Sequence, residues 1–375
     1  MNIVITSPRA PIVLEWIKIA QKGLHDILLT DSIRYPVARF NPHHTRFCHI
    51  PAPRQDFNAY THAMLKLIDW ADMVIPTCED ILYLSKLPLT DAQRAKCFMP
   101  NHELLFTLHH KFNFFDKLPD TDGIGKPKTA LITDKSQLIF DTTNHKTILK
   151  PVYSRFGRHV VRDVNQDNTT NLSISQDYPW VQQTFIHGNP LCNYAICEHG
   201  KVIAHAVYQP CYLLNQSAST YFRPIYDERA EKFIHAFAKQ NHYHGQVAFD
   251  FIDDGEYLYI LECNPRATSG LHIIGNHLTL KTDGKLHHDN HPLDTAPLRV
   301  SITLPLLFGI SALKQGKLKE LWQDYKQATD VIKDVPPYAH ALSFGEMCFR
   351  SIRYGKPLTS ASTFDIEYDG ISDDK

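Results

Sequence analysis

The sequence lacks the features that mark several protein classes. Its 375 residues carry 39 Lys and Arg against 40 Asp and Glu, so the basic excess that is typical of nucleic-acid-binding proteins is missing. No hydrophobic run approaches the length that spans a bilayer, and none of the eight cysteines belongs to a CxxC pair. We therefore expect no nucleic-acid partner, no membrane span, no zinc ribbon and no thioredoxin-like site.

The first residues also lack a secretory signal. MNIVITSPRAPIVLEWIKIAQKG has no charged segment before its apolar stretch, which Glu15 and Lys18 interrupt. This pattern favours a first strand and helix over a signal peptide. A large chain with scattered cysteines and no secretory feature is expected to keep its thiols reduced, so we predict a cytoplasmic protein with small-molecule partners.

Alternating strand and helix patterns predict a small Rossmann-like domain over residues 1–100. NIVITS and HDILLTDS have the composition of buried strands on either side of the amphipathic segment APIVLEWIKIAQKGL, and FNAYTHAMLKLIDWA and DMVIPT repeat the order. The glycine motif GxGxxG is absent, and TSPRAP follows the first strand instead. A dinucleotide site is therefore disfavoured.

The pattern changes after residue 100. NHELLFTLHHKFNFFDKL predicts one helix or two short ones, and DERAEKFIHAFAKQNH predicts another. Strand patterns surround the second helix, and the turns EHGK and DDGE each mark a hairpin, so this region has an α+β character. The last part of the chain is mostly helical in pattern and ends in the strand-like TFDIEYDG.

One hairpin, GQVAFDFIDDGEYLYILECNPR, carries an acid on its first strand and an acid and an amide on its second. Glu262 and Asn264 share a face because strand side chains alternate. Asp250 lies directly opposite Glu262 if the loop has an odd number of residues, and we predict such a loop, centred on Glu256. Opposed carboxylates repel unless a cation lies between them, and oxygen ligands of this kind suit Mg²⁺. The alternative is a solvated hairpin with polar residues on its exposed face.

This hairpin resembles the end of the ATP-grasp fold. The family signature places an acid twelve residues before Glu-x-Asn, with an arginine close by, here Arg266. TILKPVYSRFG (147–157) resembles the strand and lysine before the family's phosphate-covering loop, PWVQQTFIHGNPL (179–191) resembles its inter-lobe hinge, and residues 109–129 resemble its first lysine helix and the following strand. The resemblance spans nearly residues 1–300 in family order and is of the carbamoyl-phosphate-synthase-like, carboxylate–amine ligase type.

The resemblance implies a multidomain α/β and α+β chain. It consists of a Rossmann-like pre-ATP-grasp domain with a parallel sheet (1–100), an ATP-grasp small lobe with a linker helix (101–185), an ATP-grasp large lobe (186–305) and a mostly helical C-terminal extension (306–375).

The resemblance also implies a set of site residues for ATP and Mg²⁺, with Mn²⁺ as an alternative ion. The implied metal ligands are Asp250, Glu262 and Asn264, and the implied catalytic cations are Lys150 and Arg266. Lys150 also matches the lysine that contacts the α- and β-phosphates. Lys111, with Lys117 as an alternative, matches the first nucleotide-contacting lysine. The hinge positions that match an adenine site are Gln183, Thr184, Phe185 and Ile186.

The sequence departs from the family pattern at three places. The phosphate loop YSRFGRH has only Gly157, so Ser154 and Arg155 are expected to cap phosphates in place of backbone amides. Pro190 replaces an acid that often contacts ribose, and SGL replaces SGG after Arg266. None of these changes removes an implied metal ligand.

Three smaller features have simpler explanations. HHDNH (287–291) has metal-ligand residue types but lies in a polar loop, and Cys192 and Cys263 are more typical of buried structural thiols than of nucleophiles. We expect a substrate pocket near TSPRAP, Arg223 and ATSGLH (267–272), with Arg223 binding a substrate carboxylate in preference to pairing with an exposed acid.

The leading functional hypothesis is an ATP-dependent ligase that activates a carboxylate as an acyl phosphate for attack by an amine or a similar nucleophile. The alternatives are phosphorylation of carbamate, a regulator that binds ATP without turnover, and a plain Rossmann-type binding protein. The sequence leaves open whether the chain forms a homodimer.

Overall fold

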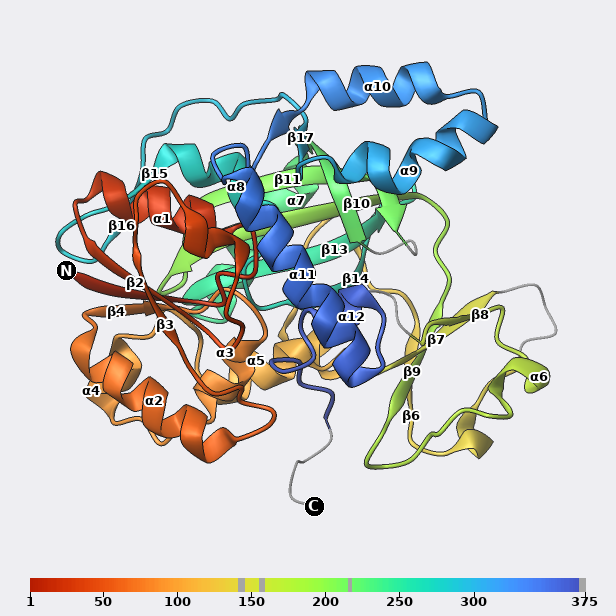
Figure 1. Cartoon of the computed structure of the whole chain (residues 1–375). Helices are drawn as coiled ribbons and strands as arrows, with labels where there is room; N and C mark the ends of the chain where they lie inside the picture. The colour runs from red at the N-terminus through yellow and green to blue at the C-terminus, as the bar shows by residue number, and fades with distance from the viewer. Residues whose placement is uncertain (141–145, 155–158, 215–217, 371–375) are drawn as a thin grey trace.

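The structure is a computed structural model that describes residues 1–140, 146–154, 159–214 and 218–370 (Figure 1). The N-terminal domain is built on a parallel sheet of strand order β3-β2-β1-β4. Because strand residues alternate faces, Ile3 and Ile5 pack with helix α1 while Val4 packs with helix α2. The elements are β1 (Asn2–Thr6), α1 (Val13–Lys22), β2 (Asp26–Asp31), β3 (Arg46–His49), α2 (Phe57–Trp70) and β4 (Met73–Ile75).

Short helices lie within this domain, between β2 and β3, and after its last strand. They are η1 (Val37–Phe40), α3 (Asp80–Ser85), α4 (Asp91–Ala95), α5 (His102–His109) and η2 (Asn113–Lys117). The predicted helix over residues 101–118 is therefore two short ones. Asn101 caps α5 because its side chain accepts a hydrogen bond from the Leu104 backbone N–H.

A small antiparallel sheet of order β6-β9-β7-β8 follows as a separate lobe, on the right of Figure 1. Ile132, Leu149 and Trp180 form its small core. Its elements are β6 (Thr129–Ile132), η3 (Lys135–Gln137), β7 (Thr147–Pro151), β8 (Val161–Arg162), α6 (Gln166–Thr169) and β9 (Trp180–Thr184).

The large sheet has the order β18-β17-β12-β11-β10-β13-β14-β5. Helix α7 (Glu228–Gln240) buries Phe233 and Phe237 against Phe249 and Phe251 of this sheet. The strands are β5 (Ile124–Gly125), β10 (Asn189–Glu198), β11 (Lys201–Leu214), β12 (Ala218–Ile225), β13 (Gly245–Asp253), β14 (Leu258–Asn264), β17 (Leu298–Arg299) and β18 (Thr329–Asp330). The next elements are α8 (Leu271–Ile274), η4 (Gly275–His277) and the small hairpin of β15 (Leu278–Leu280) and β16 (Leu286–His288).

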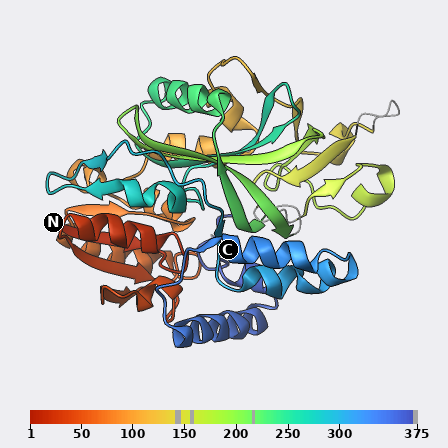
Figure 2. The same cartoon turned by 90° about the horizontal axis from the view of Figure 1, so that it is seen from above.

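The C-terminal extension is helical, as predicted. Its helices are α9 (Thr303–Lys314), α10 (Leu318–Gln327), α11 (Pro337–Tyr354) and α12 (Leu358–Ala361). Figure 2 shows α7 on one side of the large sheet, with α9, α10 and α11 on the other side. In Figure 1, α11 crosses in front of the N-terminal domain and the large sheet.

The prediction of a final strand is wrong. Residues 363–366 of TFDIEYDG form turns, and the following residues extend without joining a sheet. The apolar–polar alternation of this segment imitates a strand. Its contacts are of another kind: the Asp365 carboxylate binds two arginines, and the Asp365 carbonyl accepts a hydrogen bond from the Arg54 backbone N–H.

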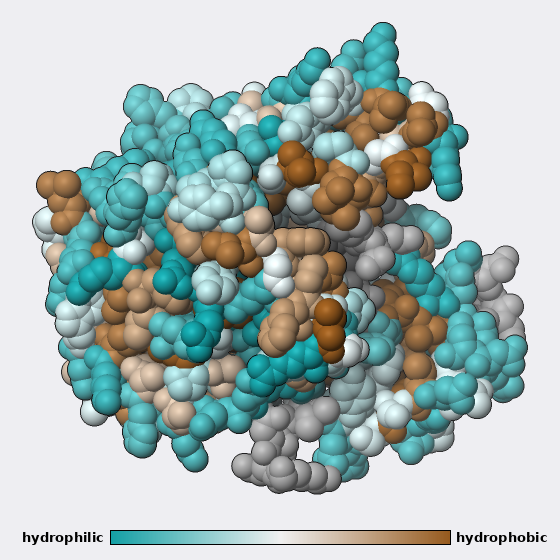
Figure 3. Space-filling view, in the orientation of Figure 1, coloured by the Kyte–Doolittle hydropathy of each residue, from teal (hydrophilic) through white to brown (hydrophobic). Residues whose placement is uncertain are grey.

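Apolar side chains gather on the outer faces of α9 and α11 (Figure 3). Leu306, Ile310 and Leu313 of α9 and Phe349 and Ile352 of α11 are largely exposed. Contiguous exposed apolar surface is typical of binding surfaces. A homodimer stays a prediction. No helix in the described ranges is long and apolar enough to cross a membrane.

Candidate functional site

The acidic hairpin forms as predicted, but its register has another origin. Asp250 lies directly opposite Glu262, which confirms the predicted pair. The loop between β13 and β14, residues 254–257, has an even number of residues and by itself puts these two side chains on opposite faces. A bulge at Leu261 shifts the register between Asp250 and Phe251 and restores the pair. The predicted odd loop is therefore wrong.

The two acids, Asn264 and Arg266 form one polar cluster. The Asn264 side-chain nitrogen donates to Asp250 Oδ2 (3.1 Å), and Arg266 Nη2 donates to Asn264 Oδ1 (3.0 Å). Lys111 Nζ lies 3.3 Å from Glu262 Oε2. The Asn264 oxygen thus faces Arg266, and a half-turn of the terminal amide is needed to turn it toward a cation beside Asp250.

The two carboxyl groups have opposite electrostatic environments. Burial and the neighbouring Glu262 charge raise the pKa of Asp250. Burial acts in the same direction on Glu262, but Lys111 and Lys150 outweigh it and hold the pKa of Glu262 below its ordinary value. The pair therefore favours one shared proton. A divalent cation bound between the two groups would replace that proton.

The residues present fit a hard divalent cation. Two carboxylates and an amide oxygen are the ligand types that Mg²⁺ and Mn²⁺ take, with water or phosphate oxygens completing the shell. Within the described ranges, no group of three or more His, Cys, Asp and Glu side chains is arranged to hold a metal ion. His287, His288 and His291 therefore make no such group.

The two lysines reach the hairpin from different elements. Lys150 on β7 is buried, and its Nζ donates to Gln183 Oε1 and to the Leu261 carbonyl, both at 3.2 Å. Burial lowers the pKa of Lys150 to about 8, although Glu262 acts against this shift. Lys111 lies between α5 and η2 and donates to the Ser154 carbonyl at 2.7 Å. Lys117, the alternative to Lys111, does not line the cavity beside the hairpin.

Of the four predicted adenine positions, Gln183 contacts a lysine of the site through its side chain. The Gln183 side chain is fully buried between Lys150 and Thr129, so it positions a lysine. The backbone N–H groups of Thr184 and Phe185 donate to the carbonyls of Lys128 and Lys146. Phe185 packs edge-on against His187. None of the residues from Gln183 to Ile186 lines the cavity beside the hairpin, so their role in adenine binding stays a prediction.

Ser154 lies at the end of the strand that carries Lys150. Its Oγ donates to the Pro151 carbonyl at 3.2 Å, and its own carbonyl accepts the bond from Lys111. It lines the cavity, where it could meet a phosphate. Arg155 falls outside the described residues.

The cluster lines a cavity of about 280 Å³. Sequence reasoning found its acids, Asn264, Lys111, Ser154 and Arg266, but missed Glu79, which lies 3.4 Å from Arg266 Nε. Glu79 lies in the loop after β4. Its position just after a strand of a parallel sheet could have indicated a site residue, because ligands bind at the carboxyl ends of such strands. Cys192 lies opposite Asp250 on the neighbouring strand, and its half-buried side chain lines the cavity. Burial raises the pKa of the Cys192 thiol.

A second cavity of about 330 Å³ adjoins the first. Both cavities are lined by Ser219, Arg266, Thr268 and Ser269. The second is bounded by residues of TSPRAP and ATSGLH, the segments where we expect a substrate pocket, and its role in substrate binding stays a prediction. Gly270 lets this turn approach β10, because a Cβ there would lie 2.3 Å from the Tyr194 Cβ.

The preferred role of Arg223 is not supported. Its guanidinium donates to Asp324 Oδ1 at 3.0 Å, its side chain is 46% exposed, and it lines neither cavity. Arg223 therefore pairs with an acid, the alternative that the sequence had also allowed, although this acid, Asp324 of α10, is partly buried.

Comparison with known proteins identifies the central part of the chain. Residues 108–270 match the family model of the ATP-grasp domain. This segment is an ATP-grasp domain, and it contains the acidic hairpin, both lysines and Arg266. A search of curated protein sequences gives no significant match.

Solved structures share the fold over most of the chain. N5-carboxyaminoimidazole synthetase from Staphylococcus aureus, complexed with ADP, is 12% identical, with a TM-score of 0.61 over 84% of this chain and 86% of its own. An ADP complex of N5-carboxyaminoimidazole ribonucleotide synthetase is 15% identical (TM-score 0.60, 84% of each chain). L-amino acid ligase from Bacillus licheniformis is 13% identical (TM-score 0.53, 74% of this chain and 70% of its own). At these identities the likeness establishes the fold: a parallel N-terminal sheet, a two-lobed ATP-grasp fold and a helical C-terminal extension.

Proposed function

We propose that the protein is an ATP-dependent ligase that activates a carboxylate as an acyl phosphate for attack by an amine or a similar nucleophile. The observation that carries this proposal is the polar cluster in the ATP-grasp domain. There Asp250, Glu262 and Asn264 share one face of a hairpin, with Lys111 at 3.3 Å from Glu262. A second cavity opens beside Arg266.

The first step is phosphoryl transfer. A carboxylate oxygen of the substrate attacks the γ-phosphorus of ATP, and the bond to the β,γ-bridging oxygen breaks, so that ADP leaves with the electron pair. The protein contributes position and positive charge to this step. Lys150 and Lys111 stabilise the phosphates, Ser154 caps them, and Arg266 stabilises the transferred group at the junction of the two cavities.

Mg²⁺, when bound, neutralises phosphate charge, and Asp250, Glu262 and Asn264 would hold it. The opposed carboxylates support this assignment, because Asp250 lies directly opposite Glu262 and their like charges favour a cation between them. In the second step an amine nitrogen attacks the acyl carbon, inorganic phosphate leaves with the electron pair, and the nitrogen loses a proton. The names of the similar structures, an amino acid ligase and two ribonucleotide or imidazole synthetases, also support a ligase.

The alternatives make different predictions for one experiment. The protein is incubated with ATP, Mg²⁺ and pools of carboxylates and amines, and ADP and phosphate are measured. Phosphate release that depends on particular acids supports the ligase, and phosphate release with bicarbonate and ammonia alone supports carbamate phosphorylation. Tight ATP binding without ADP in any pool supports a non-catalytic regulator and contradicts the proposal.

A further inference from the structure

The second cavity is lined by chemically different groups, and these restrict what it can hold. It lies between the turn after β1, the turn after β14 and helix α11. Its walls are mainly apolar, with Ile12, Ile33, Val300 and Met347 among them. Its charged lining residues include Arg266, which it shares with the first cavity, and Glu346 on α11. If the proposed function is correct, this cavity is where the acid substrate meets the phosphoryl group.

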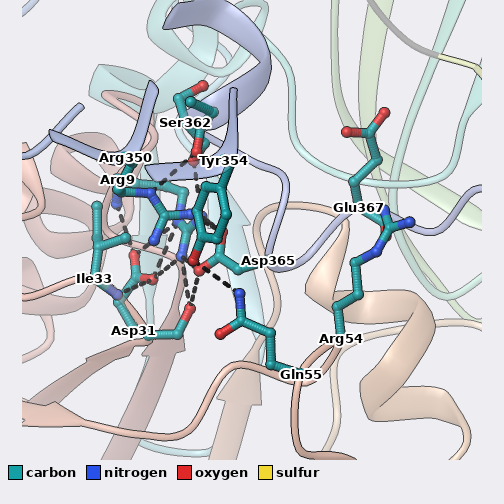
Figure 4. A network of polar contacts seen from close by, with 12 residues as sticks. Arg9, Asp31, Ile33, Arg54, Gln55, Arg350, Tyr354, Ser362, Asp365 and Glu367 are labelled. Atoms are coloured by element: carbon teal, nitrogen blue, oxygen red, sulfur yellow. Dashed lines mark hydrogen bonds and ion pairs between the residues drawn. The ribbon is translucent and has the colours of Figure 1, made fainter. Parts of the chain in front are cut away.

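Arg9 is the obvious candidate to bind a substrate carboxylate, but its donors are already in use. Its guanidinium donates to the carboxylates of Asp31 and Asp365, to the Ser362 carbonyl and to the Ser32 hydroxyl (Figure 4). These acceptors engage all three nitrogens, and the side chain is 6% exposed. A guanidinium has five N–H donors, so Arg9 has none left for a ligand.

Arg350, the next cation at the cavity, is only partly engaged. Its Nε donates to the Ala361 carbonyl at 3.0 Å and its Nη2 to Asp365 Oδ1 at 2.5 Å. Arg266 contacts Asn264, Glu79 and the Ala267 carbonyl, which leaves part of its five-donor capacity for a ligand. Of the three arginines, Arg266 is the one that lines both cavities, whereas Arg9 and Arg350 do not line the cavity of the acidic hairpin. Its position at the junction therefore makes Arg266 the one suited to receive a carboxylate that faces the phosphoryl group, beside the hydroxyls of Ser219 and Ser269.

Glu346 gives the cavity a negative group without a cation. Its two oxygens accept hydrogen bonds from the backbone N–H groups of Arg34 (2.8 Å) and Tyr35 (2.7 Å). Within the part of the chain that the structure describes, no Lys, Arg or His nitrogen lies within ion-pair distance of this carboxylate. Each carboxylate oxygen can accept a second bond, so Glu346 is preorganised to accept one from a positively charged ligand.

A further polar atom of the cavity has no partner. Thr363 follows the Ser362 that binds Arg9, and its residue is 7% exposed. Its hydroxyl is buried without a hydrogen bond among the described residues, and it lines the same cavity. A buried polar atom of this kind is usually satisfied by a ligand or water.

We propose that the second cavity binds a carboxylic acid that also carries an ammonium group on an apolar carbon body. Its carboxylate lies at Arg266, facing the phosphoryl group, its ammonium group lies at Glu346, and its carbon body packs against the apolar walls. The substrate is thus an amino acid in the broad chemical sense. Helix α11 of the C-terminal extension selects for the ammonium group.

Binding measurements on matched acids test this assignment without requiring turnover. Isothermal titration in the presence of Mg²⁺ and a non-hydrolysable ATP analogue compares L-leucine with 4-methylpentanoate, and 6-aminohexanoate with hexanoate. The first pair places the ammonium group next to the carboxylate and the second at the far end. We expect the amino member of at least one pair to bind about ten-fold more tightly than its counterpart, the order expected of a hydrogen bond between charged groups.

Variants assign that preference to Glu346. Glu346→Gln keeps an oxygen for the loop amides but removes the charge, and it should abolish the preference. Met347→Lys places a cation beside Glu346 and should do the same if Glu346→Gln folds poorly. Glu320→Gln, at an exposed position of α10, makes the same charge change and should leave the preference intact. Equal binding within both pairs, a preference that survives both cavity variants, or no binding of any acid overturns the assignment.

The outcomes separate this inference from the proposed function. If acids without an amino group support ADP formation as well as their amino counterparts, the ligase stands and the assignment of Glu346 fails. If no acid supports ADP formation, the ligase fails, and the titrations still decide whether the cavity binds ammonium carboxylates.

Discussion

The substitution Asp365→Asn should release the C-terminal segment from the N-terminal domain. Asp365 is fully buried and accepts hydrogen bonds from Arg9, Arg350 and Ser32 (Figure 4). In the substituted protein, Arg9 keeps the carboxylate of Asp31, whereas the buried Arg350 loses the carboxylate with which it pairs. Breaking a buried pair by removing one partner costs about 3–5 kcal/mol.

The pH dependence of this contribution has a definite sign. Burial alone would raise the pKa of Asp365, but Arg9, Arg350 and Ser32 outweigh it and hold the pKa well below its ordinary value. The unfolded chain binds a proton at about pH 4, while the folded chain does not. The stabilisation is therefore present above about pH 4 and is lost as the pH falls below that value.

Hydrogen exchange measured by mass spectrometry is the suitable assay, because a chain with several cores need not unfold in one transition. Peptides from α11 to Asp369 should exchange at least about 100-fold faster in Asp365→Asn than in the wild type at pH 7, since 3 kcal/mol corresponds to about two powers of ten. Asp334→Asn changes the same charge at an exposed position and should leave exchange unchanged. Exchange within about three-fold of the wild type at pH 7, or a difference that does not shrink as the pH falls below 4, would refute the reasoning.

Three further predictions concern the polar cluster. Asp250→Asn combined with Glu262→Gln should abolish Mg²⁺-dependent ADP formation, because it removes both carboxylates that would hold the ion; unchanged turnover would contradict the metal assignment. The pKa of Lys150 is about 8 in the free protein, and a bound phosphate raises it. Nucleotide affinity should therefore fall by up to about ten-fold per pH unit above pH 8. The affinity of Lys150→Met for the nucleotide should show no such dependence on pH. Gln183→Leu removes one of the two hydrogen-bond acceptors of the buried Lys150 ammonium and so lowers the pKa of Lys150. The fall in nucleotide affinity should then begin at a lower pH. A fall that begins at the same pH as in the wild type would show that Gln183 does not position the lysine.

Local patterns were sufficient for the N-terminal sheet and for most of the site. Buried strands such as NIVITS have a composition that few other elements share, and their parallel order follows from the helices between them. The hairpin acids were predictable because side chains alternate along a strand. The turn at the C-terminus was not predictable, because alternation alone cannot distinguish a strand from an extended segment held by ion pairs.

The register of the hairpin shows where sequence reasoning ends. Asp250 and Glu262 were expected to oppose each other through an odd loop, whereas an even loop and a bulge at Leu261 give the same pair. A bulge depends on how the two strands pack against their neighbours, and no residue near Leu261 marks it. The prediction of the pair was therefore right for a reason that the sequence did not contain.

By itself the sequence determined the order of the elements and the face that carries the acids, with Arg266 just beyond them, because these depend on spacing along a few neighbouring residues. Lys150 meets the hairpin at the Leu261 carbonyl, 111 residues away in the chain, and this contact depends on the tertiary structure. Only the tertiary structure decided which charges remain available to a ligand. Arg9 and Asp365 are 356 residues apart in the chain, yet their contact withdraws Arg9 from binding. Charge neutralisation depends on distances of a few ångströms in space, which spacing along the sequence does not encode.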